Sequence, residues 1–183
     1  MRRTNRTIPA ALIALLGATA CTAPPADGPA TADDFTESDA LQLENLVRTV
    51  EIMHEKFTAL AAAMPEDDLG WVPMEGVRTV EEVFIHVAAD NWWVPAMMGW
   101  EAPPETNVTE DPATFTAYQE QTMTREEMLE ALDASFVFFI ASMRDSAGDL
   151  DRGVSLRGTP AVVDDIWIRA TVHLHEHLGQ SIA

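Results

Sequence analysis

Apolar residues recur at spacings of three and four along four stretches of this chain, which is the period of an amphipathic helix. The stretches cover about residues 39–64, 79–98, 124–143 and 159–183. The apolar face of the first consists of Leu43, Leu46, Val50, Met53, Phe57, Leu60 and Met64. That of the third consists of Met128, Leu132, Phe136, Phe139 and Met143. We find no run that alternates as a half-exposed strand would, so four helices are predicted.

Local signals mark where three of these helices begin. Thr79 with Glu82, and Thr124 with Glu127, have the spacing of a capping box. Pro160 suits the first position of the fourth helix. Residues 99–123 contain three prolines and read as a long crossover, with a short helix around "ATFTAYQEQ". The pattern therefore predicts an all-α four-helix bundle with a long crossover between its second and third helices.

The first twenty residues have the pattern of an export signal. A basic start, "MRRTNRT", precedes an apolar stretch that is short for a membrane span and ends in "ATA". Cys21 follows at once and is the only cysteine in the sequence, as in a bacterial lipobox, although Ala18 stands where that motif usually has Leu. We expect a signal peptide over 1–20, lipidation of Cys21, a flexible tether over 21–37 and a folded domain over 38–183. Ordinary secretion with a free Cys21 is the alternative.

The charge of the chain restricts its partners. With 30 acidic and 11 basic residues, the net charge is −19, and Arg2, Arg3 and Arg6 lie in the leader. Such an acidic domain repels phosphate backbones, so no nucleic-acid partner is expected. It is equally unsuited to lying on an anionic bilayer, so contact with the membrane is expected only through a lipid anchor at Cys21.

Three of the five histidines cluster in "HLHEHLGQ" near the end of the sequence. Residues four apart share a helix face, so His173 and His177 lie together, and His175 points elsewhere. The apolar residues Val163, Ile166 and Ala170 continue into that face, which ends at Gln180. Because buried imidazoles are costly unless they are satisfied, a divalent metal is one explanation for the pair.

The third ligand is predicted to be His86, which shares a face of the second helix with Val83, Asp90 and Trp93. Facing helices of a bundle are where such sites are built. The alternatives are a hydrogen-bonded pair of histidines or an incidental polar helix end. A metallopeptidase H-x-x-E-H motif also fits, but the chain leaves little room for a downstream ligand. His54 is expected to be structural or exposed.

The stretch "GVRTVEEVFIHVAADNWW", followed by "HLHEHLGQ", resembles the DinB/YfiT-like superfamily over about residues 38–183. The resemblance implies a bundle with down-up-up-down connectivity. It also implies a divalent metal, commonly zinc or nickel with iron as a further candidate, held by His86, His173 and His177. Characterised relatives include thiol-dependent transferases and maleylpyruvate isomerases, whereas most members have no assigned reaction.

From these features we expect a metal-dependent enzyme of the cell envelope that acts on a small molecule, with a thiol as one candidate. A water or substrate thiolate on the metal would be the nucleophile, in a transferase or hydrolase reaction. Asp90, Glu176 and Gln180 are candidates for orienting or proton-transferring roles, and Trp92, Trp93, Trp100 and Phe115 are candidate pocket walls. Export separates the protein from cytosolic thiols. A non-catalytic metal-binding lipoprotein is the rival, and a homodimer is one expected assembly state.

Overall fold

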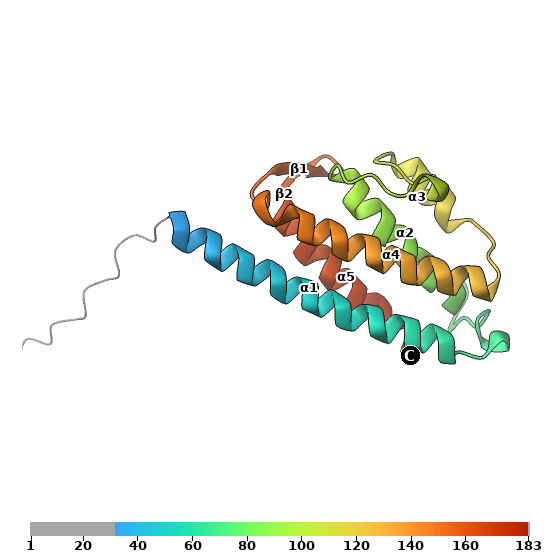
Figure 1. Ribbon diagram of the computed structural model, residues 1–183. Helices are drawn as coiled ribbons and strands as arrows, with labels where there is room; N and C mark the ends of the chain where they lie inside the picture. Colours follow the sequence, from blue (N-terminus) through green and yellow to red (C-terminus); the bar gives the residue numbers. More distant parts are fainter. Residues whose placement is uncertain (1–31, 183) are drawn as a thin grey trace, which may run out of the picture. The chain divides into compact units, whose positions relative to one another are not determined.

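Residues 32–182 are the part of the chain that the computed structural model describes, and they form five α-helices, three short 3-10 helices and one β-hairpin (Figure 1). The predicted signal peptide, Cys21 and the tether up to residue 31 lie outside the described residues. The α-helices are α1 (Ala32–Ala63), α2 (Val80–Met97), α3 (Pro112–Gln119), α4 (Arg125–Asp145) and α5 (Val163–Ile182). The 3-10 helices are η1 (Glu66–Asp68), η2 (Pro104–Thr106) and η3 (Ser146–Gly148).

Helices α1, α2, α4 and α5 form the bundle, so the predicted all-α class is confirmed. Each of α4 and α5 packs against both α1 and α2. Helices α1 and α5 run in one direction and α2 and α4 in the other, which is down-up-up-down connectivity (Figure 1). The crossover between α2 and α4 carries α3, which packs on α2. None of the helices in the described part combines the length and apolar character needed to cross a bilayer.

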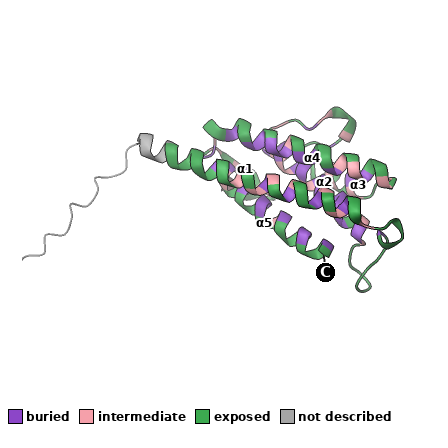
Figure 2. Ribbon diagram, turned by 60° about the horizontal axis from the view of Figure 1, so that its bottom comes forward, coloured by how far each residue is buried: buried purple, intermediate pink, exposed green. Residues whose placement is uncertain are grey.

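The core lies between the four long helices (Figure 2). The expected apolar face of the third helix is fully buried on α4, and on α1 the residues Leu43, Val50, Met53 and Phe57 are buried. The largest enclosed side chain is Trp167 of α5, whose Nε1 donates a hydrogen bond to Ser146 Oγ at 2.9 Å. Both predicted capping boxes are present, at Thr79 for α2 and at Thr124 for α4.

Helix α1 begins at Ala32 rather than near Asp39, so it extends into the segment predicted as tether. The sequence contains neither proline nor glycine between Pro29 and Pro65, and nothing local therefore breaks the helix there. The start of the first helix that was expected from the composition of residues 22–34 is therefore too late in the sequence.

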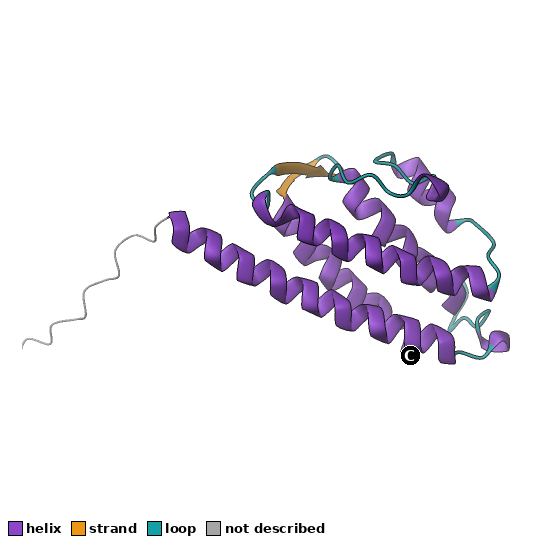
Figure 3. Cartoon of the chain, viewed as in Figure 1, coloured by secondary structure: helices purple, strands orange, loops and turns teal. Residues whose placement is uncertain are grey.

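The prediction of a helix starting at Thr159–Pro160, with no strands in the chain, is wrong. Strands β1 (Gly153–Leu156) and β2 (Thr159–Val162) form an antiparallel hairpin, and α5 follows it directly (Figure 3). The turn residues Arg157 and Gly158 have φ of 51° and 83°, as a two-residue hairpin turn requires. Pro160 is tolerated because both strands of this ribbon are edges. Strands of four residues are too short for an alternation of apolar and polar residues to be recognised in the sequence.

Candidate metal centre

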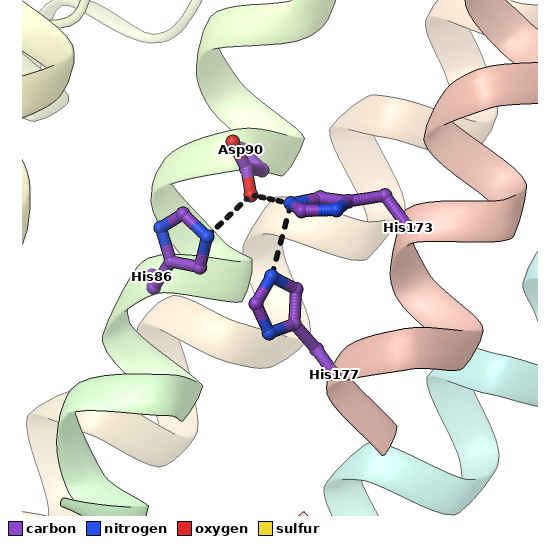
Figure 4. Close-up of side chains that lie close together, drawn as sticks. All are labelled: His86, Asp90, His173 and His177. Carbon is purple, nitrogen blue, oxygen red and sulfur yellow. Dashed lines mark hydrogen bonds and ion pairs between the residues drawn. The ribbon is translucent and has the colours of Figure 1, made fainter. Parts of the chain in front are cut away.

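Two helices of the bundle, α2 and α5, supply a cluster of polar side chains. His86 and Asp90 lie one turn apart on α2, and His173 and His177 lie one turn apart on α5, so each pair projects from one face. Figure 4 shows the four side chains pointing toward one another from the two helices. The helices run antiparallel side by side, which brings residues far apart in the sequence into one site.

The ligand atoms of these four residues all lie within 4.8 Å of one another. Asp90 Oδ2 is 3.1 Å from His86 Nε2 and 3.1 Å from His173 Nε2. His173 Nε2 is 2.9 Å from His177 Nε2. The structure thus brings together the three histidines predicted as ligands. It also places Asp90, predicted as an orienting group, a base or the fourth ligand of a closed site, among the donor atoms themselves.

A glutamine holds the far side of the His86 ring. His86 Nδ1 donates a hydrogen bond to Gln119 Oε1 at 2.6 Å, and the same oxygen accepts a second bond from Arg78 Nη2 at 3.1 Å. Because Arg78 can only donate, it fixes which end of the Gln119 amide faces the ring. Neutral His86 therefore carries its proton on Nδ1 and directs the Nε2 lone pair at the cluster.

The other two rings also have outer acceptors. His177 Nδ1 donates to Gln180 Oε1 at 2.8 Å, so its Nε2 lone pair likewise faces inward. His173 Nδ1 lies 3.5 Å from Glu176 Oε2, a looser contact at the edge of the helix. Metal-binding histidines commonly have such partners, which set the tautomer and the ring orientation. The structure thus places Gln180 and Glu176 outside the cluster, each next to one ring.

The cluster holds more lone pairs than protons. With His86 and His177 in these tautomers, their Nε2 atoms and Asp90 Oδ2 are all acceptors, and only a proton on His173 Nε2 could be shared among them. Converging lone pairs repel one another unless a cation lies between them. Imidazole nitrogens with one carboxylate oxygen suit zinc, nickel and iron. The residues present therefore fit a divalent metal.

The three histidines of the cluster differ in exposure to solvent and in the direction of their pKa shifts. His86 and His177 are 6 % and 4 % exposed, whereas 44 % of the His173 side chain is exposed. Burial lowers the pKa of His86, and burial with repulsion from His173 and His86 lowers the pKa of His177 to about 4. The hydrogen bond to Asp90 raises the pKa of His173. His173 thus lies at the margin of the core rather than inside it as predicted, and Gln180 is exposed.

The four residues of the cluster lie within a segment that matches a known protein family. The model of the DinB superfamily matches residues 49–181, which include all four cluster residues and most of the bundle. The chain belongs to the DinB superfamily. The search of curated proteins gave no match.

The remaining histidines of this DinB-superfamily chain lie outside the cluster, as predicted. His175 is exposed, and its Nδ1 donates to the carbonyl oxygen of Thr171 at 2.8 Å. His54 Nε2 lies 2.7 Å from Asp133 Oδ1, and its ring stacks on Phe136 with centroids 5.0 Å apart. The contact of His175 lies within α5, and those of His54 join α1 to α4.

The aromatic residues expected to wall a pocket fall into two groups. Phe115 of α3 packs edge-on to His86, with centroids 5.8 Å apart, and Trp93 packs on Phe115. Trp92 donates a hydrogen bond to Tyr118, and Trp100 packs on Trp167, so both belong to other parts of the molecule. Of these four aromatic residues, only Phe115 and Trp93 therefore lie beside the histidine cluster.

A cleft of about 820 Å³ lies beside the cluster, lined in part by Gln119 and Gln180, the outer partners of His86 and His177. Nothing in the sequence marks Gln119 as a partner of His86. It lies on a short helix within the crossover, and no spacing relates it to His86. The short helix itself was predicted, but only packing of α3 on α2 shows which of its polar residues reaches the ring.

Proposed function

We propose that this protein binds a divalent metal, such as zinc, nickel or iron, through His86, His173 and His177 and works as a metal-dependent enzyme. The observation that supports this most is the convergence of three imidazole Nε2 atoms with their Nδ1 sides facing outer acceptors. Two buried neutral rings with inward lone pairs are preorganised for a cation. They are poorly suited to hydrogen-bonding each other.

A divalent ion held here would lower the pKa of a bound water or thiol toward neutrality. The chain's own residues supply the rest of the chemistry. Asp90 Oδ2, next to His86 and His173, is placed to hold or accept a proton at the site. The exposed side of His173 gives a small molecule access from solvent. A thiol-dependent transferase or a hydrolase reaction fits such a centre.

We place this activity in the cell envelope, with the protein anchored by a lipid on Cys21. The support is the basic and apolar leader followed by "ATAC". A thiol substrate would then be one that occurs outside the cytoplasm.

A non-catalytic metal-binding lipoprotein is the second candidate, and the position of Asp90 favours it. If Asp90 Oδ2 is a fourth ligand, zinc would have four protein ligands, which is typical of a closed structural site. An open site would instead leave one position for water or substrate.

The metal content of the purified protein tests the proposal. Wild type and His175→Ala should carry about one equivalent of metal, and His173→Ala should lose it. Equal metal in wild type and His173→Ala would refute the assigned ligands. Asp90→Asn separates the two candidates: retained metal with lost thiol-conjugating or hydrolytic turnover indicates an enzyme. Lost metal together with lost folding indicates a structural site.

A further inference from the structure

The cleft beside the metal centre is formed by the segment between α1 and α2, the start of α2, and α3. Its volume of about 820 Å³ lies in the range of small-molecule sites. Because Gln119 and Gln180 line the cleft and also hydrogen-bond His86 and His177, the cleft adjoins the outer side of the cluster. A molecule bound there would lie against the two residues that orient the ligand rings.

Arg78 is the only cationic residue among those that line this cleft. A guanidinium has five N–H donors, and among the described residues the side chain of Arg78 donates only to Gln119. It forms no ion pair within residues 32–182, although the protein is rich in acids. Donors therefore remain for an incoming anion, and a guanidinium binds a carboxylate through two parallel hydrogen bonds.

The acidic residues of the cleft leave room for that anion. Glu82 already accepts a hydrogen bond from the Thr79 backbone at 2.7 Å in the capping box of α2, which holds its carboxylate at the helix end. Glu120 is exposed, and its charge is therefore screened by water.

Apolar side chains form another wall of the cleft. Trp71 is 50 % exposed and Val77 is 44 % exposed, and both line the cleft together with buried Val83. Burying the exposed apolar surface of a tryptophan and a valine under an apolar group of a ligand is favourable, because that surface is removed from water. The wall and Arg78 together match a molecule with one apolar part and one anionic end.

We propose that this cleft binds a small organic carboxylate, with the carboxylate on Arg78 and the apolar part against Trp71 and Val77. The inference deepens the proposed function, since it names a class of small molecule that binds beside the metal centre, on the outer side of His86 and His177. The hydrogen bonds from Arg78 to Gln119 and from His86 to Gln119 link the anion site to the centre through one side chain. A bound carboxylate would thus lie one residue away from a metal ligand.

The test compares two probes, 3-phenylpropionate and its neutral amide 3-phenylpropanamide, by titration calorimetry on the full chain after removal of metal by chelation. Removing metal prevents the probe from binding to the ion. We expect the carboxylate to bind at least about tenfold more tightly than the amide. We expect Arg78→Gln to abolish that preference and Arg78→Lys to retain part of it. Arg169→Gln, at an exposed position of α5 outside the cleft, should bind as wild type does.

Equal affinity of the two probes for wild type, or no binding of either, would overturn the proposal, and so would a preference that survives in Arg78→Gln. The comparison on wild type decides the matter even if a variant folds poorly. The metal content of the same preparations keeps the two proposals apart. Loss of metal in His173→Ala with intact probe binding supports both. Probe binding with no metal in wild type refutes the metal centre alone.

Discussion

At the scale of single residues, the three histidines differ in how they bind protons. His86 and His177 are buried, which lowers the pKa of each, and their Nδ1–H groups donate hydrogen bonds to Gln119 and Gln180. Both are therefore neutral and face the cluster with a lone pair. His173 is half exposed and lies against the carboxylate of Asp90, which favours its charged form. Of the three rings, His173 is the one at which a proton competes most strongly with a metal ion for the Nε2 lone pair.

In the metal-free protein, we expect His173, whose pKa is raised by Asp90, to take up a proton before His177, whose pKa is lowered to about 4. A proton on His173 Nε2 removes a ligand, so metal affinity should fall as the pH falls through the raised pKa of His173. It should be restored above that pKa. NMR titration of the imidazole C–H signals and metal affinity measured against pH check this.

Asp90→Asn is the control for that titration, because it removes the carboxylate that raises the pKa of His173. The pKa of His173 should then move down while His177 stays low. The assignment fails if His177 is protonated before His173 in wild type.

At the scale of secondary-structure elements, the short helix α3 affects the centre although it is not part of the four-helix bundle. It packs on α2 and brings Gln119 to His86 and Phe115 to the edge of the same ring. The crossover is thus a part of the site rather than a plain connection. A hydrogen bond from a metal-binding histidine to such a partner fixes the ring and strengthens the ligand.

Gln119→Ala should therefore weaken zinc binding by about 10- to 100-fold while the helical content is unchanged. The reason is that His86 loses the acceptor that fixes its tautomer. Competition with a chromophoric chelator measures the affinity, and circular dichroism measures the helix. Gln121→Ala, just beyond α3 and outside the cluster, is the matched control. Equal affinities of the two variants would show that α3 does not act on the centre.

At the scale of the whole molecule, the cluster joins α2 to α5 within the C-terminal half of α5. Among the described residues of α5 that follow His177, only Leu178 and Ser181 are buried. A metal bound by both helices would tie this end of α5 to the bundle. Because it binds the folded state alone, it would also shift the folding equilibrium.

Zinc at about 100 times its Kd should raise the free energy of unfolding by about 2.7 kcal/mol, and a chelator should reverse the gain. Thermal unfolding followed by circular dichroism measures the shift. His175→Ala, which leaves the cluster intact, should keep it, and His177→Ala should lose it. A zinc-dependent rise that persists in His177→Ala would place the metal elsewhere.

The sequence by itself determined the bundle, its capped helix starts and the pairing of His173 with His177. These features follow from residues close together in the chain, where the helical period fixes which side chains share a face. The same period placed His86 and Asp90 on one face of α2. It also separated His175 from the other two histidines before any contact was known.

Only the tertiary structure decided what surrounds those faces. The distance from Asp90 to His173, the reach of Gln119 to His86 and the exposure of His173 depend on how α2, α3 and α5 pack, which no local period encodes. The hairpin before α5 depends on backbone conformations at Arg157 and Gly158 that four-residue strands do not reveal in sequence. Local order along a helix is set by neighbours in the chain, whereas a site between helices is set by the packing that brings distant residues together.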